Sequence, residues 1–340
     1  MERRSPRYLF AGKLTRDYIV FPSGEPLIDV LGGNVLYAAL GAVIWEPDPP
    51  PAIIARVGED YPHEWLERFK QLGINPQGIN IIPEAVDLRS FVAILDSVTR
   101  ANDEPVAHFA RLGRPFPKAL LGYHPPSFTT MDSRTRMQPT SLRSNDIPTE
   151  FLGAGVIHLC PMDYLTQSLL PAYFRQNQFT TVTLDPSVGY MNPTYWNDVS
   201  AILIGLTAFL PSEDGLRSLF QGKSDDLWEM AAALSDFQCE IIVINRGERG
   251  QLVYDAASKN KWEVPPYPAR AINPIYARDA FCGGFLAGYR RSFDPLEATL
   301  FGNISASIVV EGQMADFALE VLPGLPEARL ESLRNSVRKV

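Results

Sequence analysis

Short runs of β-forming residues alternate with longer helical stretches along most of this chain of 340 residues. This alternation is typical of βαβ units, in which parallel strands are joined by helices that cover the sheet. It predicts an α/β fold with a mainly parallel sheet. Strands are expected at Tyr8–Ala11, Ala52–Val57, Val156–Cys160, Thr181–Asp185, Ala201–Ile204 and Ile241–Asn245. Helices are expected at Val35–Trp45, His63–Leu72, Asp225–Phe237, Asp279–Ser292 and Pro295–Glu311, with a further surface helix from Leu325 onward.

Two segments, about 14–31 and 87–112, depart from this alternation of strands and helices. They carry short β-type runs separated by turns, at Tyr18–Phe21, Ser90–Leu95 and Val106–Ala110. We expect antiparallel excursions from the main sheet that form a small lid. Residues 113–148 are rich in Pro, Ser, Thr and Arg, and a polar loop of that length is usually functional or disordered. Its arginines could collect an anionic ligand, although a solvated surface loop is favoured. The whole chain, 1–340, is predicted to be one domain.

Composition excludes several classes of protein. An apolar content of 46% and a charged content of 21% are those of a globular protein in water. The net charge of −8 argues against a nucleic acid or an anionic membrane as the main partner. No apolar run reaches the length of a membrane span, and no secretory signal is visible, so a cytoplasmic location is predicted. Three cysteines and four histidines are dispersed, which predicts buried free thiols and no metal site held by these residues.

The stretch NPIYARDAFCGGFLAGY, residues 273–289, places Asp279 at the start of a glycine-rich helix. Gly283 and Gly284 follow one turn later. Glycine inside a helix costs about 1 kcal/mol relative to alanine. The pair therefore indicates that another backbone or a ligand approaches this helix closely.

Several segments in order resemble the ribokinase-like (PfkB) family of carbohydrate and nucleoside kinases. The resemblance rests on RVGED followed by LGI, and on TLDPS, INRGERG and DAFCGGFLAGY, and it extends from Tyr8 to about Gly312. It implies a three-layer sandwich, with a mostly parallel sheet between helices and a small β lid. It also implies transfer of the γ-phosphoryl group of ATP, with Mg²⁺, to a hydroxyl of a sugar, nucleoside or related polyol. A homodimer formed through the lid would be consistent with the family.

The resemblance also assigns roles around Asp279. The family reads DTTGAGD before this helix, and its closing Asp takes the proton of the acceptor hydroxyl. Asp279 is therefore the expected catalytic base, and Ala277 and Arg278 fall in the anion hole that receives the phosphate. Tyr276 and Arg278 stand where the family has glycine. Arg278 could contribute its charge to a phosphate, or it could fill the anion site and pair with a neighbouring acid.

On the acceptor side, the resemblance points to Asp17, Gly32, Gly33 and Asn34 as substrate-binding residues. We expect them to converge with Asp279 on one pocket beneath the lid, with the Asp279 carboxylate kept ionised by the helix N-terminus. On the nucleotide side, the matching residues are Gly247, Gly250, Asn303 and Ser307.

The NxxE element, which organises magnesium in the family, falls on Ser212 and Gly215. The neighbouring acids Glu213 and Asp214 could substitute for it after a register shift. The favoured interpretation is that they are first-turn acids of a helix that begins at Ser212.

Two hypotheses remain open. In the first, the chain is an ATP- and magnesium-dependent kinase with Asp279 as base. In the second, it binds a small polyol without phosphorylating it, because both anion-hole glycines and the NxxE pair are replaced. Preorganised donors are worth about 3–4 kcal/mol each to a developing charge, so weak nucleotide binding is expected. A NAD-dependent Rossmann enzyme is excluded, since no GxGxxG follows a strand.

Overall fold

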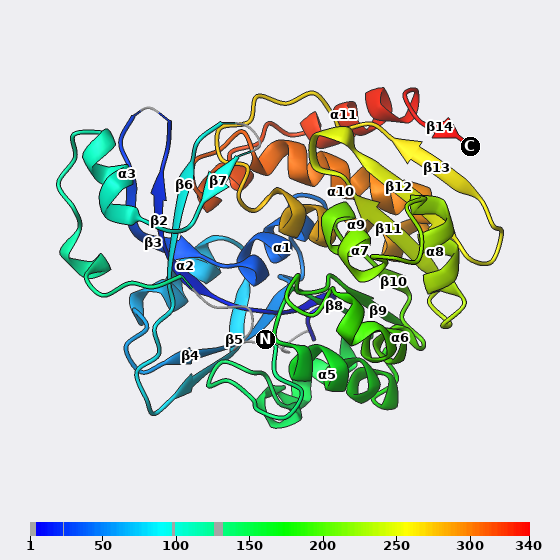
Figure 1. Cartoon of the computed structure of the whole chain (residues 1–340), viewed down its shortest axis with the longest axis horizontal. Coiled ribbons are helices and arrows are strands. Elements are labelled where there is room, and N and C mark those ends of the chain that lie inside the picture. Colours follow the sequence, from blue (N-terminus) through cyan, green and yellow to red (C-terminus); the bar gives the residue numbers. More distant parts are fainter. Residues whose placement is uncertain (1–4, 23, 97–98, 126–131) are drawn as a thin grey trace.

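The computed structural model describes residues 5–22, 24–96, 99–125 and 132–340. Its main sheet has the strand order β14-β13-β12-β11-β10-β9-β8-β1-β4-β5 (Figure 1). The strands from β11 to β5 are parallel to one another, and β12, β13 and β14 extend the sheet in antiparallel fashion. The strand bounds are β1 Leu9–Ala11, β4 Ala52–Gly58, β5 Asn75–Ile82, β8 Val156–Leu159, β9 Thr181–Leu184, β10 Ala208–Phe209, β11 Ile241–Asn245, β12 Gln251–Asp255, β13 Lys261–Val264 and β14 Arg338–Lys339.

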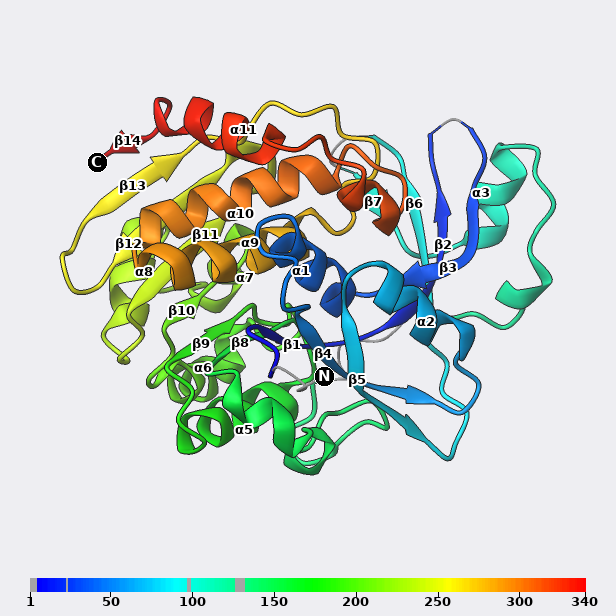
Figure 2. The ribbon, with the colours of Figure 1, turned by 180° about the vertical axis from the view of Figure 1, so that it is seen from behind.

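Helices cover both faces of this sheet, because its strands bury side chains on both sides. In β1, Phe10 belongs to one apolar core while Leu9 and Ala11 belong to the other. The first core is covered by α1 (Asn34–Val43), α2 (Glu64–Gln71), α9 (Ala277–Ser292), α10 (Pro295–Val309) and α11 (Leu325–Arg334) (Figure 2). The second is covered by α5 (Tyr164–Gln176), α6 (Trp196–Leu203), α7 (Glu213–Leu219) and α8 (Leu227–Ser235). The predicted three-layer α/β architecture is confirmed.

A separate four-stranded sheet, which we call the small sheet, lies at one end of the molecule (Figure 1). Its order is β3-β2-β6-β7, from β2 (Thr15–Val20), β3 (Leu27–Gly32), β6 (Arg89–Ile94) and β7 (Arg100–Ala101). The pair β2 and β6 is parallel and the other pairs are antiparallel. A helix, α3 (Pro105–Arg111), packs Phe109 against Phe91 of this sheet. The strand expected at Val106–Ala110 was therefore wrong, since Pro105 at the first helical position begins a helix there.

Two further expectations are corrected. The apolar run Ala201–Ile204, expected as a strand, lies at the end of α6, which buries Val199, Ile202 and Leu203 at helical spacing. A short apolar run does not distinguish a strand from a buried helix. The C-terminal helix ends at Arg334, and the chain then adds β14 to the edge of the main sheet.

The polar loop 113–148 lies partly outside the described residues, at 126–131. Its described parts contain the 3₁₀ turns η1 (Lys118–Leu120) and η2 (Ser144–Asp146), and Asp132 is buried against α5. The other 3₁₀ turns are η3 (Thr149–Gly153), η4 (Pro193–Tyr195), η5 (Gly247–Arg249) and η6 (Ala315–Leu319). Within the described chain, every helix is too short or too polar to cross a membrane.

The glycine pair of α9 allows helices to pack at backbone contact. A β-carbon at Gly283 would overlap the carbonyl oxygen of Ala38 in α1, and one at Gly284 would overlap the hydroxyl of Ser305 in α10. From the opposite side, a β-carbon at Gly41 of α1 would overlap the carbonyl of Ala280. Another backbone, and not a ligand, therefore accounts for these glycines.

Gly283→Ala should lower the free energy of unfolding by about 1–3 kcal/mol, as overpacking of a core does. The loss arises although alanine favours a helix over glycine by about 1 kcal/mol. Urea unfolding followed by circular dichroism measures it. Gly153→Ala is the control, because a β-carbon there would lie 3.4 Å from Ser5, an ordinary contact. Equal stability of the two variants would contradict the packing argument.

Candidate functional site

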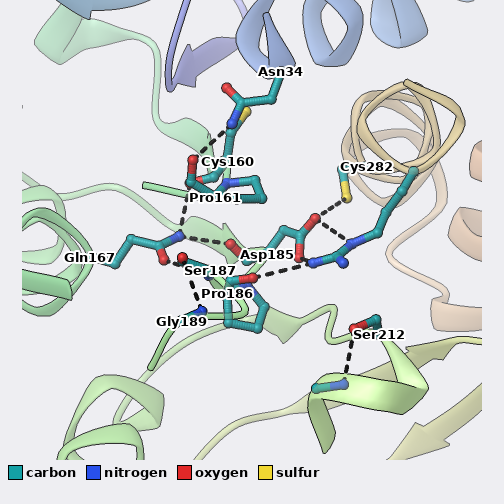
Figure 3. A network of polar contacts seen from close by, with 12 residues as sticks. Asn34, Cys160, Pro161, Gln167, Asp185, Pro186, Ser187, Gly189, Ser212 and Cys282 are labelled. Carbon is teal, nitrogen blue, oxygen red and sulfur yellow. Dashed lines mark hydrogen bonds and ion pairs between the residues drawn. The ribbon is translucent and has the colours of Figure 1, made fainter. Parts of the chain in front are cut away.

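The candidate site lies where the parallel strands of the main sheet end, which is the usual ligand position in open α/β sheets. Asp185 directly follows the end of β9, and Pro161 is the second residue after the end of β8. Asn34 is the first residue of α1 (Figure 3). The start of α9 brings Arg278, Asp279 and Cys282 to the same edge. Sequence segments separated by more than two hundred residues therefore meet here.

Asp279 is the third residue of α9 and is half-buried. Burial raises its pKa to about 7, although the positive charges of Arg278 and Arg100 and its own backbone N–H act in the opposite direction. The expectation that the helix N-terminus keeps this carboxylate fully ionised was wrong, because loss of solvent outweighs the favourable charges. A carboxyl group with this pKa can exchange a proton near neutral pH.

The first turn of α9 adopts its conformation without glycine. Tyr276, its N-cap residue, has φ −106° and ψ 17°, which a residue with a side chain can adopt. The backbone N–H of Arg278 has no carbonyl acceptor among the residues that the structure describes. An N–H at a helix start, together with the helix dipole, favours an anion. With the glycines replaced, the Arg278 N–H remains without a backbone acceptor in the described chain, as first-turn N–H groups of a helix usually are.

Arg278 forms a bidentate ion pair with Asp185, whose side chain is fully buried. Its Nε lies 2.7 Å from Oδ2, and its Nη2 donates to Oδ1 and to the Pro186 carbonyl oxygen, at 3.3 Å in the latter case. The contacts around Asp185 are drawn in Figure 3. Of the two alternatives for Arg278, pairing with a neighbouring acid is observed. Its Nη1 has no partner in the described part of the chain, so this nitrogen remains available to an anion.

Asp17 is buried at the base of the small sheet and is held by two hydroxyl groups. Tyr276 donates from its phenol to Oδ2 at 2.5 Å, and Thr15 donates to Oδ1 at 2.6 Å. The phenol oxygen also accepts the Gly33 N–H at 3.1 Å. The ring of Tyr276 stacks on Tyr37 with centroids 4.1 Å apart and an interplanar angle of 8°. Burial raises the pKa of Asp17 to about 6, although both hydroxyl groups lower it.

Of the other residues predicted to bind the acceptor, Gly32 lies beside Asp17, and Gly33 and Asn34 follow it at the start of α1. A β-carbon at Gly32 would overlap the Asp17 carboxylate, and Gly33 has φ +117°, a region that favours glycine. The side chain of Asn34 accepts the Lys13 N–H at 2.8 Å and donates to the Pro161 carbonyl at 2.7 Å. Asn34 thus connects the loop after β1 to the loop after β8.

The four nucleotide-side residues lie around β12 and α10. Gly247 and Gly250 form the turn between β11 and β12, where a β-carbon at Gly250 would overlap the Val264 carbonyl. The Asn303 amide donates to Gln251 and to the Pro265 carbonyl, and its oxygen accepts the Tyr267 N–H. Ser307 accepts a hydrogen bond from Arg329. In this structure these side chains connect secondary-structure elements.

The run FLPSEDGL begins α7. Ser212 caps it by accepting the Gly215 N–H at 3.2 Å. Glu213 is buried and pairs with Arg217 at 2.8 Å and with Arg249 at 2.7 Å. The interpretation of Glu213 and Asp214 as first-turn acids is confirmed. Across the described ranges, no three His, Cys, Asp or Glu side chains gather as a metal site, and Cys160, Cys239 and Cys282 are buried free thiols.

Sequence reasoning missed the partners of the two substituted positions. Asp185, the ion-pair partner of Arg278, was within the TLDPS segment that carried the resemblance. Its contact with Arg278 depends on how the end of β9 and the start of α9 are placed in the fold. Arg100 donates from β7 to the carbonyls of Pro274, at 2.8 Å, and Ile275, at 3.4 Å. No local pattern in the sequence distinguishes this arginine from the other surface arginines.

Arg278→Met should lower the free energy of unfolding by about 1–3 kcal/mol, because it leaves the buried Asp185 carboxylate without its cation. Denaturant unfolding measures the loss, and adding Asp185→Asn should restore part of it. Arg134→Met, which breaks an exposed pair with Asp198, should cost about 0–1 kcal/mol. If Arg278→Met costs no more than Arg134→Met, the ion pair does not stabilise this edge.

Comparison with known proteins finds a family model that matches the second half of the chain and relatives over most of its length. Residues 155–321 match the pfkB family carbohydrate kinase domain. A cytidine kinase of Thermococcus kodakarensis is 24% identical over 91% of this chain and 98% of its own length. A nucleoside kinase of Methanocaldococcus jannaschii is 28% identical, over 39% of this chain and 41% of the relative.

Solved structures share the fold at low identity. A Burkholderia thailandensis nucleoside kinase in complex with inosine has a TM-score of 0.69 and 14% identity, over 96% of this chain and 98% of that one. A putative ribokinase II from E. coli in complex with ATP and Mg²⁺ has a TM-score of 0.67 and 14% identity, over 96% and 99%. Residues 155–321, just under half of this chain, therefore match the pfkB family carbohydrate kinase model, and the chain as a whole has the ribokinase-like fold.

Proposed function

We propose that this protein is an ATP-dependent kinase that phosphorylates a hydroxyl of a sugar, nucleoside or related polyol, with Asp279 as the general base. The observation that carries the proposal is Asp279 itself, a half-buried carboxyl group at a helix start with a pKa of about 7. Relatives in sequence are named as kinases of cytidine, nucleosides and inositol. They support the reaction class and leave the acceptor open.

Asp279 and the residues around it have separate roles in the proposed reaction. Asp279 takes the proton of the acceptor hydroxyl. The free N–H and the Nη1 of Arg278 provide donors and positive charge beside it, where a transferring phosphoryl group is stabilised. ATP, when bound, supplies that group, and Mg²⁺ is expected to be held mainly by its phosphates and by water. Because Glu213 is already paired with two arginines, we do not assign a metal role to it.

The small sheet serves as the lid in this proposal. Arg100 of β7 holds the carbonyls of Pro274 and Ile275, directly before α9. Ile275 also packs against Ile19, Phe21 and Ile94 of the small sheet or its loops. Movement of this sheet would therefore be coupled to the turn that presents Asp279. Exclusion of water from the reacting groups is the usual purpose of such a lid.

Asp279→Asn should reduce phosphorylation by at least about 100-fold, because the amide keeps the shape of the side chain and loses the base. The assay follows ADP release with ATP–Mg²⁺ and a panel of cytidine, inosine, D-ribose and myo-inositol. Asp294→Asn is the control, since Asp294 caps α10 and asparagine is an equally good cap. Equal rates for wild type and Asp279→Asn would remove Asp279 from the mechanism.

The rate should also depend on pH in the direction set by Asp279. Below its pKa of about 7 the carboxyl is protonated and cannot accept a proton. We therefore expect kcat/KM to fall about tenfold for each pH unit below 7 and to level off above it. A profile that is flat from pH 5.5 to 8 would contradict the assignment of this base.

A second function, binding of a polyol without transfer, is favoured by one specific observation. Arg278 occupies the anion-hole turn and is already paired with Asp185. If this pair keeps the nucleotide out, calorimetry should detect acceptor binding while ATP–Mg²⁺ gives no heat and no turnover. Binding of ATP–Mg²⁺ with a Kd in the micromolar range would favour the kinase.

A further inference from the structure

Tyr276 contacts the acceptor side of the site in the way that a hydroxyl-bearing ligand would. Its phenol donates to the Asp17 carboxylate at 2.5 Å and accepts the Gly33 N–H at 3.1 Å. A further hydroxyl, that of Thr15, lies 3.3 Å away. Carboxylate, amide N–H and hydroxyl together form a site for one hydroxyl group, and this chain fills it with its own side chain.

The ring of Tyr276 is fixed as firmly as its hydroxyl. It lies parallel to Tyr37 at 4.1 Å between centroids, and only 9% of the residue is exposed. Offset or parallel ring contacts of this kind add to the stability gained from burial alone. Arg100 and the apolar contacts of Ile275 hold the preceding residues of the same turn against the small sheet. The position of Tyr276 is thus set from three directions.

Each oxygen of the Asp17 carboxylate already accepts one hydroxyl group. Oδ2 accepts Tyr276 and Oδ1 accepts Thr15, and Asp17 is only 3% exposed. A ligand hydroxyl that takes the position between Asp17 and the Gly33 N–H must displace the phenol. A buried carboxylate left without a donor is costly, so the displaced state is disfavoured unless the ligand replaces the bond.

We propose that Tyr276 is a specificity-determining residue of the acceptor site, because its phenol occupies the hydroxyl position formed by Asp17 and the Gly33 N–H and excludes polyols that place a hydroxyl there. The inference rests on the proposed function for the identity of the acceptor site. It concerns binding, so it can be tested independently of phosphoryl transfer.

The test is Tyr276→Ser, measured by isothermal titration with D-ribose, cytidine, inosine and myo-inositol. Residue 276 is the N-cap of α9, and serine is a preferred residue there, so the variant suits the helix start while it vacates the ring volume. We expect at least one probe to bind at least ten times more tightly than it binds wild type. Tyr276→Ala serves the same purpose if the serine variant does not fold, as judged by circular dichroism.

Two controls test whether the gain in probe affinity comes from removal of the Tyr276 contact with Asp17. Tyr276→Phe removes the phenol hydroxyl and keeps the ring volume, so it should gain less affinity than Tyr276→Ser for the same probe. Adding Asp17→Asn to Tyr276→Ser should abolish most of the gain, because the partner of the ligand hydroxyl is lost. A gain below tenfold for every probe, including no binding by either protein, would overturn the inference. A gain without turnover in any variant would leave it standing and would count against the proposed kinase instead.

Discussion

The contact of α9 with α1 and α10 at glycine positions determines where the candidate site lies. Gly283 and Gly284 let α9 approach its two neighbours until backbone atoms and the Ser305 hydroxyl are in contact. Because helices in close-packed cores do not shift freely, this contact fixes the start of α9 relative to the strand ends. Asp279, Tyr276 and Arg278 owe their positions to it. The direction of each side chain is then set by the acid it meets, Asp17 for Tyr276 and Asp185 for Arg278.

These two acids separate the effects of the two substitutions. The Tyr276 phenol bonds to Asp17 and to the Gly33 N–H, on what we propose to be the acceptor side. The Arg278 guanidinium pairs with Asp185, on the proposed phosphate side, and its Nη1 has no partner among the described residues. Asp279, the next residue, has a half-buried carboxyl group with a pKa near 7. Under this proposal, replacement of the two glycines fills part of the acceptor site and still leaves hydrogen-bond donors on the phosphate side.

The sequence predicted the layers of the fold well and the interior of the site less well. The alternation of strands and helices depends on local spacing, so the mainly parallel α/β sheet was predictable, and the resemblance of segments such as DAFCGG implied the three layers. The run Ala201–Ile204 was misassigned because four apolar residues fit a helix end as well as a strand. The partners of Tyr276 and Arg278 could not be derived, because each contact joins residues about ninety or more positions apart. The pKa of Asp279 depends on burial, which only the assembled structure supplies.

The most direct test of the central claim is ³¹P NMR of the wild-type protein with ATP–Mg²⁺ and the hydroxyl-bearing panel. The account predicts a new phosphomonoester resonance from one acceptor, growing in equal amount with ADP, because Asp279 and Arg278 direct the phosphoryl group to a hydroxyl and away from water. Persistence of ATP with every acceptor, or release of inorganic phosphate without an ester, would contradict it.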